Sequence, residues 1–201
     1  MDGTIKGISV NNTSTEVHVR IAGRGTFQNG QPLRRYAMEL LGRGCNEFFV
    51  DLNQCQGMDS TFLGVLAGIG LRLMQPGHSG KIHIVNVSPR NIELLQTLGL
   101  DRLFDVNVVG RDHTHHSFPS EIDFQMLPDS DPVDTSKSLN KRDTANFMLE
   151  AHNNLVKADP RNAPKFQDLT KFLREKVGDQ QPPNPPHHDH SCLNAPKETH
   201  P

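Results

Sequence analysis

The stretch that most strongly constrains the fold spans residues 47 to 66 and reads EFFVDLNQCQGMDSTFLGVL. Its first six residues form a compact apolar run, which is typical of a central strand covered on both faces. A loop over 53–59 is expected next, followed by an apolar helix from about Ser60 to Gln75. The predicted buried stripe of this helix consists of Phe62, Val65, Leu66, Ile69 and Leu73.

The sequence on both sides of this stretch continues the alternation of strands and helices. Val17, Val19 and Ile21 alternate with polar residues, as in a strand with one buried face. Residues 23–30 are expected to form a loop. The remaining strands and helices are predicted at about 5–10, 16–22, 32–42, 81–86, 88–98 and 103–109. The order ββαβαβαβ predicts an α/β fold with a mixed sheet in which some neighbouring strands are parallel.

Several short motifs occur in a fixed order along this domain. They are Phe48-Phe49-Val50-Asp51-Leu52, Met58-Asp59-Ser60-Thr61, Leu63-Gly64-Val65-Leu66, Ser88-Pro89-Arg90, Leu98-Gly99-Leu100 and Leu103-Phe104. Together they resemble the signature of STAS domains, the family of the bacterial anti-sigma factor antagonists, over roughly residues 1 to 110. The resemblance implies a STAS-like mixed β-sheet with helices over residues 1–111 and a binding module that is not an enzyme.

The resemblance also implies a function for one serine. In bacterial family members, the serine directly after the aspartate is phosphorylated by a partner that is both a serine kinase and an anti-sigma factor. Ser60 is the matching position, and Thr61 is the alternative acceptor. The unphosphorylated domain binds that partner and frees the sigma factor. The other residues expected to contact the partner are Asp59, Thr61, Phe62, Gly64, Arg24 and Asn29.

The predicted position of Ser60 suits such a regulatory modification. Helix N-termini carry free amides and a positive dipole end, so they accept anions. Phosphorylation adds roughly −1.5 to −2 charges, which would disrupt a partner surface packed over the helix start. A simpler interpretation is that Asp59 or Ser60 only caps the helix. The two interpretations are compatible.

Two positions depart from the family pattern and keep an alternative open. Phe62 stands where the family usually has glycine, and the loop Arg24-Gly-Thr-Phe27 lacks the acidic residue often found there. These departures favour the alternative of a structural STAS subunit of a lipid-transport assembly that is not phosphorylated. A serine hydrolase is disfavoured because Ser60 lacks the Gly-x-Ser-x-Gly context of a nucleophile elbow.

The second half of the chain has a different composition. Residues 112–140 are polar and aperiodic, as in a linker, and residues 178–201 are expected to be disordered. Between them, residues 141–177 predict a C-terminal helical extension of two helices. The predicted apolar stripes contain Met148, Leu149, His152, Leu155 and Val156 in the first helix, and Phe166, Leu169, Phe172 and Leu173 in the second. Such faces need cover from each other, from the domain, or from self-association.

The bulk composition excludes several classes of function. The net charge of −2 and the lack of a basic stripe argue against nucleic-acid binding. The apolar stretch from Phe62 to Met74 is too short and glycine-broken to cross a bilayer, and we expect a cytoplasmic protein with reduced cysteines. No cofactor or metal site is predicted. The candidate ligands His113, His115, His116, His187, His188, His190 and Cys192 lack the spacing of a metal site.

Overall fold

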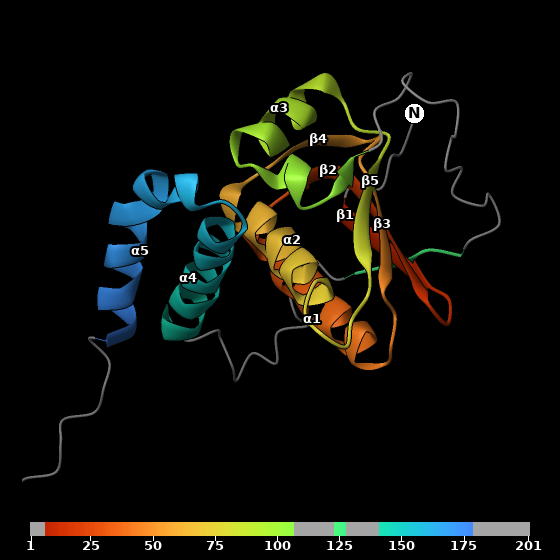
Figure 1. The fold of residues 1–201 in the computed structure, drawn as a ribbon, viewed down its shortest axis with the longest axis horizontal. Coiled ribbons are helices and arrows are strands. Elements are labelled where there is room, and N and C mark those ends of the chain that lie inside the picture. The colour runs from red at the N-terminus through yellow and green to blue at the C-terminus, as the bar shows by residue number, and fades with distance from the viewer. Residues whose placement is uncertain (1–6, 107–122, 128–140, 179–201) are drawn as a thin grey trace, which may run out of the picture.

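The computed structural model describes residues 7–106, 123–127 and 141–178 and confirms the predicted α/β fold with a C-terminal helical extension (Figure 1). Its strands are β1 (Gly7–Asn12), β2 (Glu16–Gly25), β3 (Glu47–Asp51), β4 (Cys55–Met58), β5 (Lys81–Val85), β6 (Asp105–Val106) and β7 (Gln125–Met126). Its helices are α1 (Phe27–Gly42), α2 (Ser60–Leu73), α3 (Pro89–Thr97), α4 (Lys141–Ala158) and α5 (Ala163–Gly178), with 3-10 turns η1 (Leu100–Arg102) and η2 (Pro160–Asn162).

The strands form one mixed sheet in the order β6-β5-β3-β2-β1-β7, with β4 paired to the end of β2. β1 is antiparallel to β2 and β7, whereas β2, β3, β5 and β6 are parallel neighbours. The register places Val19 beside Val50 and Val50 beside Ile84. All three side chains are buried, so the apolar positions of the three strands form one continuous row in the core.

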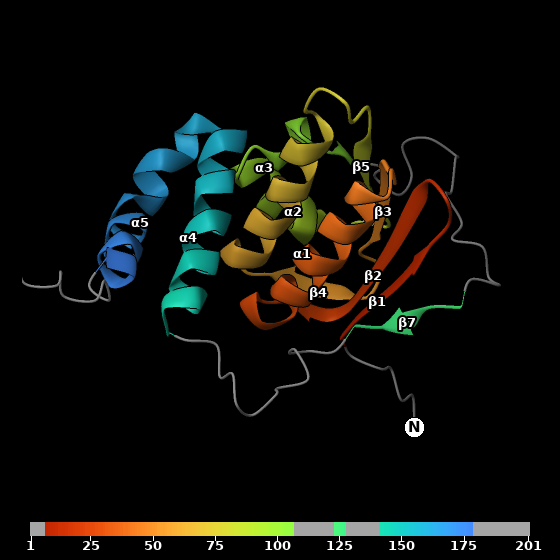
Figure 2. The ribbon, with the colours of Figure 1, turned by 90° about the horizontal axis from the view of Figure 1, so that it is seen from below.

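The helices α1, α2, α4 and α5 are arranged in layers away from one face of the sheet, whereas α3 lies beside β4 and η1 (Figure 1). α1 and α2 lie on this face, α4 packs beside α2, and α5 lies outermost (Figures 1 and 2). All five stripe residues predicted for α2 are buried, as are Leu33, Ala37 and Leu40 of α1. The part of α2 that α4 contacts is different in character, because it is lined by glycines.

The predicted loop over 23–30 is wrong, because β2 continues to Gly25 and α1 begins at Phe27. The side chain of Asn29 accepts a hydrogen bond from the backbone amide of Thr26, which stabilises the helix start. Gly30 belongs to the helix and packs closely on Phe62, since a Cβ at residue 30 would lie only 3.4 Å from the Phe62 ring. The residue types of Asn29 and Gly30 favour a turn, but in the folded protein their tertiary contacts keep both residues in the helix.

Two short strands were not predicted. β4 lies inside the stretch expected to be a loop, where its backbone pairs with Gly23, Arg24 and Gly25 of β2. β7 lies inside the segment expected to be a linker and pairs with Ser9 and Val10 of β1. Both strands contain only a few residues and lack the alternating pattern that identifies longer strands. The last predicted strand begins at Asp105, because residues 100–102 form η1.

Several predictions concern residues outside those that the structure describes. These are the predicted disorder of the tail after Gly178, most of the predicted linker over 112–140, and the candidate metal ligands in the two histidine clusters and at Cys192. Within the described ranges, no cluster of three or more His, Cys, Asp or Glu side chains is arranged to hold a metal ion. Of the helices in these ranges, none combines the length and apolar character needed to cross a membrane.

Candidate functional site

The start of α2 is held in place by the carboxylate of Asp59. This residue is the N-cap of α2, and its Oδ1 accepts a hydrogen bond of 2.8 Å from the backbone amide of Phe62. Its Oδ2 accepts a second hydrogen bond of 2.8 Å from the amide of Phe27, the first residue of α1. One carboxylate therefore satisfies an amide at the positive end of each of two helices and joins their N-termini.

The start of α1 is connected to the end of β2 by Asn29. Its side chain is buried, and Nδ2 donates a hydrogen bond of 3.0 Å to the carbonyl of Arg24. The amide of Asp59 donates to the carbonyl of Gly25 at 2.9 Å. Arg24 itself is exposed beside this junction. Asp59, Asn29 and Arg24, all predicted to contact a partner, thus lie at one junction of β2, α1 and α2.

Ser60, the predicted phosphorylation site, is the first residue of α2 and is half-buried. Its Oγ lies 3.0 Å from Nε2 of His152 in α4. Nδ1 of His152 lies 2.7 Å from the carbonyl oxygen of Met148, which can only accept a hydrogen bond. In the neutral ring the proton is therefore on Nδ1, and Nε2 accepts the hydroxyl proton of Ser60.

His152 is enclosed between helices and is only 1 % exposed. The ring of Phe166 in α5 packs edge-on against it, with 5.0 Å between ring centroids. The expectation that His152 packs into the protein is confirmed, but its pairing with Ser60 was not predicted. The helical spacing of α4 identified its stripe, whereas no local signal connects two residues 92 positions apart.

Thr61 and Phe62, the next two residues predicted to contact a partner, are buried within the domain. The Phe62 ring occupies the space above Gly25, where an added Cβ would lie 2.6 Å from the ring, and above Gly30. Phe62 therefore fits because Gly25 in β2 leaves room for its ring, whereas at Gly30 a Cβ would make only an ordinary contact. The bulk of Phe62 points into the core and leaves the outer face of α2 unchanged.

Gly64 lies on that outer face, one helical turn after Ser60, and contacts the backbone of α4. A Cβ built at Gly64 would lie 2.2 Å from the carbonyl oxygen of Ala151. Real Cβ atoms do not approach a backbone oxygen so closely, so the two helices can touch here only because residue 64 is glycine. Among the residues predicted for the partner surface, Ser60 and Gly64 are the two that α4 covers.

α4 also contacts α1. Glu150 accepts two hydrogen bonds from Nη2 of Arg34, at 2.7 and 2.9 Å, in a partly exposed ion pair. The tip of the Phe147 ring lies 3.7 Å from a Cβ built at Gly30. A groove between α1, α2 and α4 adjoins the ion pair, and its lining includes Arg72 and Lys157 but neither Ser60 nor His152.

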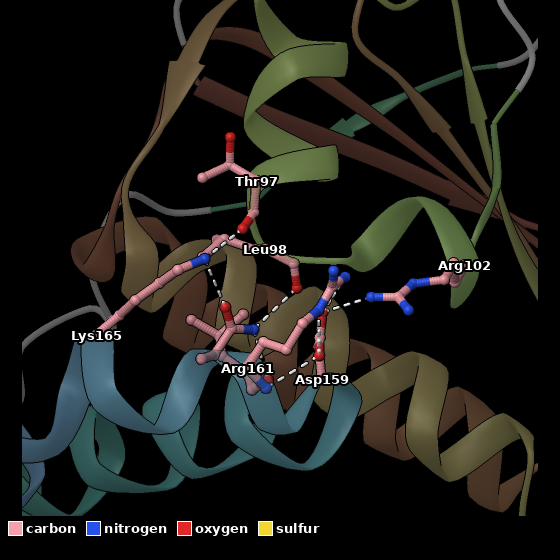
Figure 3. A network of polar contacts seen from close by, with 8 residues as sticks. Thr97, Leu98, Arg102, Asp159, Arg161 and Lys165 are labelled. Carbon is pink, nitrogen blue, oxygen red and sulfur yellow. Dashed lines mark hydrogen bonds and ion pairs between the residues drawn. The ribbon is translucent and has the colours of Figure 1, made fainter.

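The turn between α4 and α5 is attached to the end of α3 and to η1 by a polar network (Figure 3). Oδ2 of Asp159 accepts hydrogen bonds from Arg102 at 2.5 Å and from Arg161 at 2.8 Å. The hydrogen bonds and positive charge of Arg161, together with the charge of Arg102, lower the pKa of Asp159 from its usual 3.8 to about 2. Asp159 therefore remains a carboxylate in all but strong acid.

Two further residues strengthen this attachment. Asn162, which is fully buried, donates hydrogen bonds of 2.9 Å to the carbonyls of Leu98 and Leu155. Lys165 donates to the carbonyl of Thr97. Gly99 has a φ of +67°, and a Cβ there would lie 2.2 Å from Oδ2 of Asp159. The glycine of the predicted Leu98-Gly99-Leu100 motif thus makes room for the hairpin turn.

Both cysteines in the part of the chain that the structure describes are buried. Cys45 and Cys55 are free thiols, and burial raises the pKa of Cys55. Cys55 lies in β4, where Asn91 of α3 donates a hydrogen bond to its carbonyl at 3.0 Å. A buried thiol with a raised pKa is a poor nucleophile, so Cys55 has a packing role here.

The sequence matches a known protein family over part of its length. A family described as the Mlab, STAS domain matches residues 8–109, which is half of the chain. The matched range contains the helices α1 to α3 and the strands β1 to β6, except for the first residue of β1. The match ends before β7, α4 and α5. Among curated proteins, no sequence matches the chain.

Solved structures similar to this one include anti-sigma factor antagonists. SpoIIAA in its unphosphorylated form is 18 % identical, with 51 % of this chain and 90 % of that chain covered and a TM-score of 0.46. Phosphorylated SpoIIAA from Bacillus is 17 % identical, with 51 % and 93 % covered and a TM-score of 0.43. A Thermotoga maritima protein provisionally described as an anti-sigma factor antagonist is 18 % identical, with 51 % and 87 % covered and a TM-score of 0.45.

Proposed function

The chain belongs to the STAS domain family, and we propose from this premise that it is an anti-sigma factor antagonist-like regulatory module controlled by phosphorylation at Ser60. Its unphosphorylated form binds a partner that combines a serine kinase with an anti-sigma factor, and phosphorylation ends that binding. The module thereby regulates transcription in the cytoplasm. Thr61 is a weaker candidate acceptor because its side chain is buried in the described fold.

The position of Ser60 is the observation that carries this proposal. Ser60 is the first residue of α2, directly after the N-cap Asp59, and its hydroxyl points out of the domain toward α4. A phosphoryl group on this hydroxyl would lie at the positive end of α2, which its own domain tolerates. A partner packed on the same face would meet roughly two added negative charges beside the carboxylate of Asp59.

The proposed partner surface combines residues from the end of β2 and from α2. Asp59, Ser60 and Gly64 present polar atoms and backbone, and Arg24 adds a positive charge at the edge. The contribution of Asn29, Thr61 and Phe62 is indirect. All three are buried and hold the helix starts in position under the partner surface. Substitution of Arg24 should therefore weaken partner binding without unfolding the domain, whereas substitution of Phe62 should do both.

We propose a binding function rather than catalysis, although Ser60 and His152 are arranged like a nucleophile and its base. His152 is almost fully buried, and the described groove beside α4 is not lined by either residue. That groove therefore offers a substrate carbonyl no route to Ser60. A fluorophosphonate probe should leave Ser60 unlabelled in the full chain. Stoichiometric labelling at Ser60 would overturn this part of the proposal.

Phosphate transfer from the cognate kinase tests the proposed function. The kinase should transfer phosphate to the wild-type chain and not to Ser60→Ala, and Ser60→Asp should bind the kinase at least about 10-fold more weakly than the wild type. Thr61→Ser is a useful control, because it retains a hydroxyl at residue 61 and leaves Ser60 intact. Equal binding of Ser60→Asp and wild type would contradict the proposal.

A second candidate is a structural STAS subunit of a lipid-transport assembly, without phosphorylation. The hydrogen bond from Ser60 to the buried His152 favours it, since this bond gives Ser60 a structural function in the unmodified chain. In that case the chain should co-purify with membrane transporter subunits, and Ser60→Ala should retain this association. Ser60→Ala should also bind any kinase with the same affinity as the wild type.

A further inference from the structure

We infer that the α4–α5 hairpin is a displaceable cover of the proposed partner surface, so that the chain regulates access to Ser60 through its own C-terminal helices. This inference rests on the proposed function and concerns the regulation of the same site. In the docked form, α4 lies over α2 as Figures 1 and 2 show. In the released form, Ser60 and the surrounding face of α2 are open to a kinase or binding partner.

The covered face of α2 is shaped to receive a helix. Ser60, Gly64 and Gly68 recur every four residues and therefore lie along one stripe of α2. A Cβ at Gly64 would lie 2.2 Å from the Ala151 carbonyl oxygen, and one at Gly68 would lie 2.5 Å from Nδ2 of Asn154. The stripe is therefore a shallow track that α4 occupies with its backbone at Gly64 and with the Asn154 side chain at Gly68.

The same track contains the residue on which the proposed function depends. Within the docked hairpin, Ser60 meets His152, and Phe166 of α5 packs edge-on against the His152 ring. A series of side-chain contacts, from Ser60 to His152 and from His152 to Phe166, thus connects α2 with α4 and α4 with α5. A kinase needs the Ser60 hydroxyl in its own active site, which the docked α4 excludes because Nε2 of His152 is only 3.0 Å away.

The edges of the docked hairpin are polar. Arg34 and Glu150 form an exposed ion pair, and such pairs contribute little once water competes for them. Asp159 pairs with the exposed side chains of Arg102 and Arg161 at the other end. Residues 128–140 join the hairpin covalently to the rest of the chain, so a released hairpin stays tethered.

A phosphoryl group on Ser60 is incompatible with the docked hairpin. The modification removes the hydroxyl proton that Nε2 of His152 accepts and replaces it with a bulky dianion. The phosphate oxygens do not fit between a hydroxyl oxygen and a ring nitrogen that are already in hydrogen-bond contact. Phosphorylation should therefore follow release of the hairpin and prevent its return.

The cover has a quantitative consequence for the partner. If the partner binds only the released form, its apparent dissociation constant is the intrinsic value divided by the released fraction. A hairpin docked about 99 % of the time would weaken apparent binding about 100-fold. Conditions that release the hairpin would strengthen binding by the same factor.

The test uses the full chain with Gly64→Ala, which adds one methyl group at the closest contact with α4. Alanine favours the helix, so α2 itself should not be weakened. Gly42→Ala at the end of α1 is the matched control, because a Cβ at Gly42 meets no atom within 4 Å. Gly64→Leu, with Gly42→Leu as its control, keeps the test decisive if α4 merely shifts to accept one methyl group.

The readouts are amide hydrogen exchange and thiol labelling of a Ser60→Cys substitution, located by peptide mass in each background. In the Gly64 variants, α4 and α5 should exchange at least about 10-fold faster while β2 and β3 stay protected, and the thiol introduced at position 60 should react at least about 10-fold faster. The Gly42 controls should behave like the parent chain. Protection of α4 and slow labelling in both Gly64 variants would overturn the inference.

Neither readout involves a kinase, so this inference and the proposed function can fail separately. Phosphate transfer to Ser60 that is faster in Gly64→Ala than in Gly42→Ala supports both. Because Gly64 itself belongs to the proposed partner surface, the deciding comparison uses Leu155→Asp, which disrupts docking from a buried position in α4. Equal transfer to the wild type and to Leu155→Asp, with the hairpin released in Leu155→Asp, would overturn the cover. Absence of transfer to every variant, with thiol labelling at position 60 accelerated as expected, would contradict only the proposed function.

Discussion

Replacing Asp59 with alanine should destabilise the domain by about 1.5–3 kcal/mol, because one carboxylate caps two helices. The hydrogen bond to the Phe62 amide is an N-cap interaction, whose loss costs about 0.5–2 kcal/mol. The hydrogen bond from the Phe27 amide is also charge-assisted, and its more exposed position limits it to about 1 kcal/mol. The sum gives the expected change in the free energy of unfolding.

Asp59→Asn separates the two contributions. Asparagine caps a helix as well as aspartate does, so its amide oxygen can still accept from Phe62. Its NH2 group cannot accept from Phe27, so this variant should lose only about 1 kcal/mol. The expected order of stability is wild type, then Asp59→Asn, then Asp59→Ala.

Urea unfolding followed by circular dichroism measures these differences directly, with the slope m as a check that all variants unfold in the same way. Asn53→Ala is a suitable control at an exposed loop position near the site. An Asp59→Ala variant within about 0.5 kcal/mol of the wild type would refute the two-helix cap. An Asp59→Asn variant as stable as the wild type would refute the separate contribution of Phe27.

Four other predictions follow from the described contacts. Phe62→Ala should cost about 3–5 kcal/mol in urea unfolding, because it empties the space above Gly25 and Gly30, and a loss below about 1 kcal/mol would contradict the packing. Ser60→Ala should weaken hairpin docking by about 1–3 kcal/mol in hydrogen exchange, because it leaves Nε2 of the buried His152 without its donor, and unchanged exchange of α4 would argue against this bond. The pKa of Asp159 is lowered from 3.8 to about 2, so the contribution of this carboxylate to hairpin docking is fully present above about pH 4 and is lost as the pH falls through about 2. NMR spectra of α5 recorded at decreasing pH should show the hairpin loosening in the wild type, and this acid response should be absent in Asp159→Asn. An identical acid response of the two chains would contradict the prediction. Finally, self-association through the C-terminal helices stays a prediction, for which the 52 % exposed Phe172 is the candidate contact; Phe172→Glu should lower the sedimentation coefficient at high concentration, and a wild type that is monomeric throughout would refute it.

The part of the fold that could be predicted from sequence is the part with long, regular apolar patterns. The alternation of Val17, Val19 and Ile21 predicted β2, and the stripe from Phe62 to Leu73 predicted α2. Ser88 and Pro89 identified the start of α3, where Ser88 accepts a hydrogen bond from the Asn91 amide as expected. In each case, the local pattern and the tertiary environment require the same residues.

The parts that could not be predicted depend on contacts between distant segments. The start of α1 was missed because Asn29-Gly30 has turn chemistry, whereas in the structure Asn29 caps the helix and Gly30 is part of it, in contact with Phe62. β4 and β7 exist because neighbouring strand edges offer hydrogen-bonding partners, which no pattern within so few residues can reveal. Short segments therefore carry little information about their own structure.

The site shows the same division between local and distant information. The motif Met58-Asp59-Ser60-Thr61 was sufficient to place Asp59 and Ser60 at the start of a helix, and the structure has them there. The apolar stripe of α4 was sufficient to predict that His152 is packed. The sequence did not indicate that these two predictions concern the same place, because helix pairing depends on packing between faces and not on spacing along the chain.

The most direct test of the central claim locates the phosphate after incubation of the full chain with the cognate serine kinase. Peptide mass spectrometry should find the phosphoryl group on Ser60, within the segment that begins α2, and Gly64→Ala should accept it faster than Gly42→Ala. A chain that carries phosphate elsewhere, or that gains none on Ser60 even when Gly64→Ala has released the hairpin, would contradict the account.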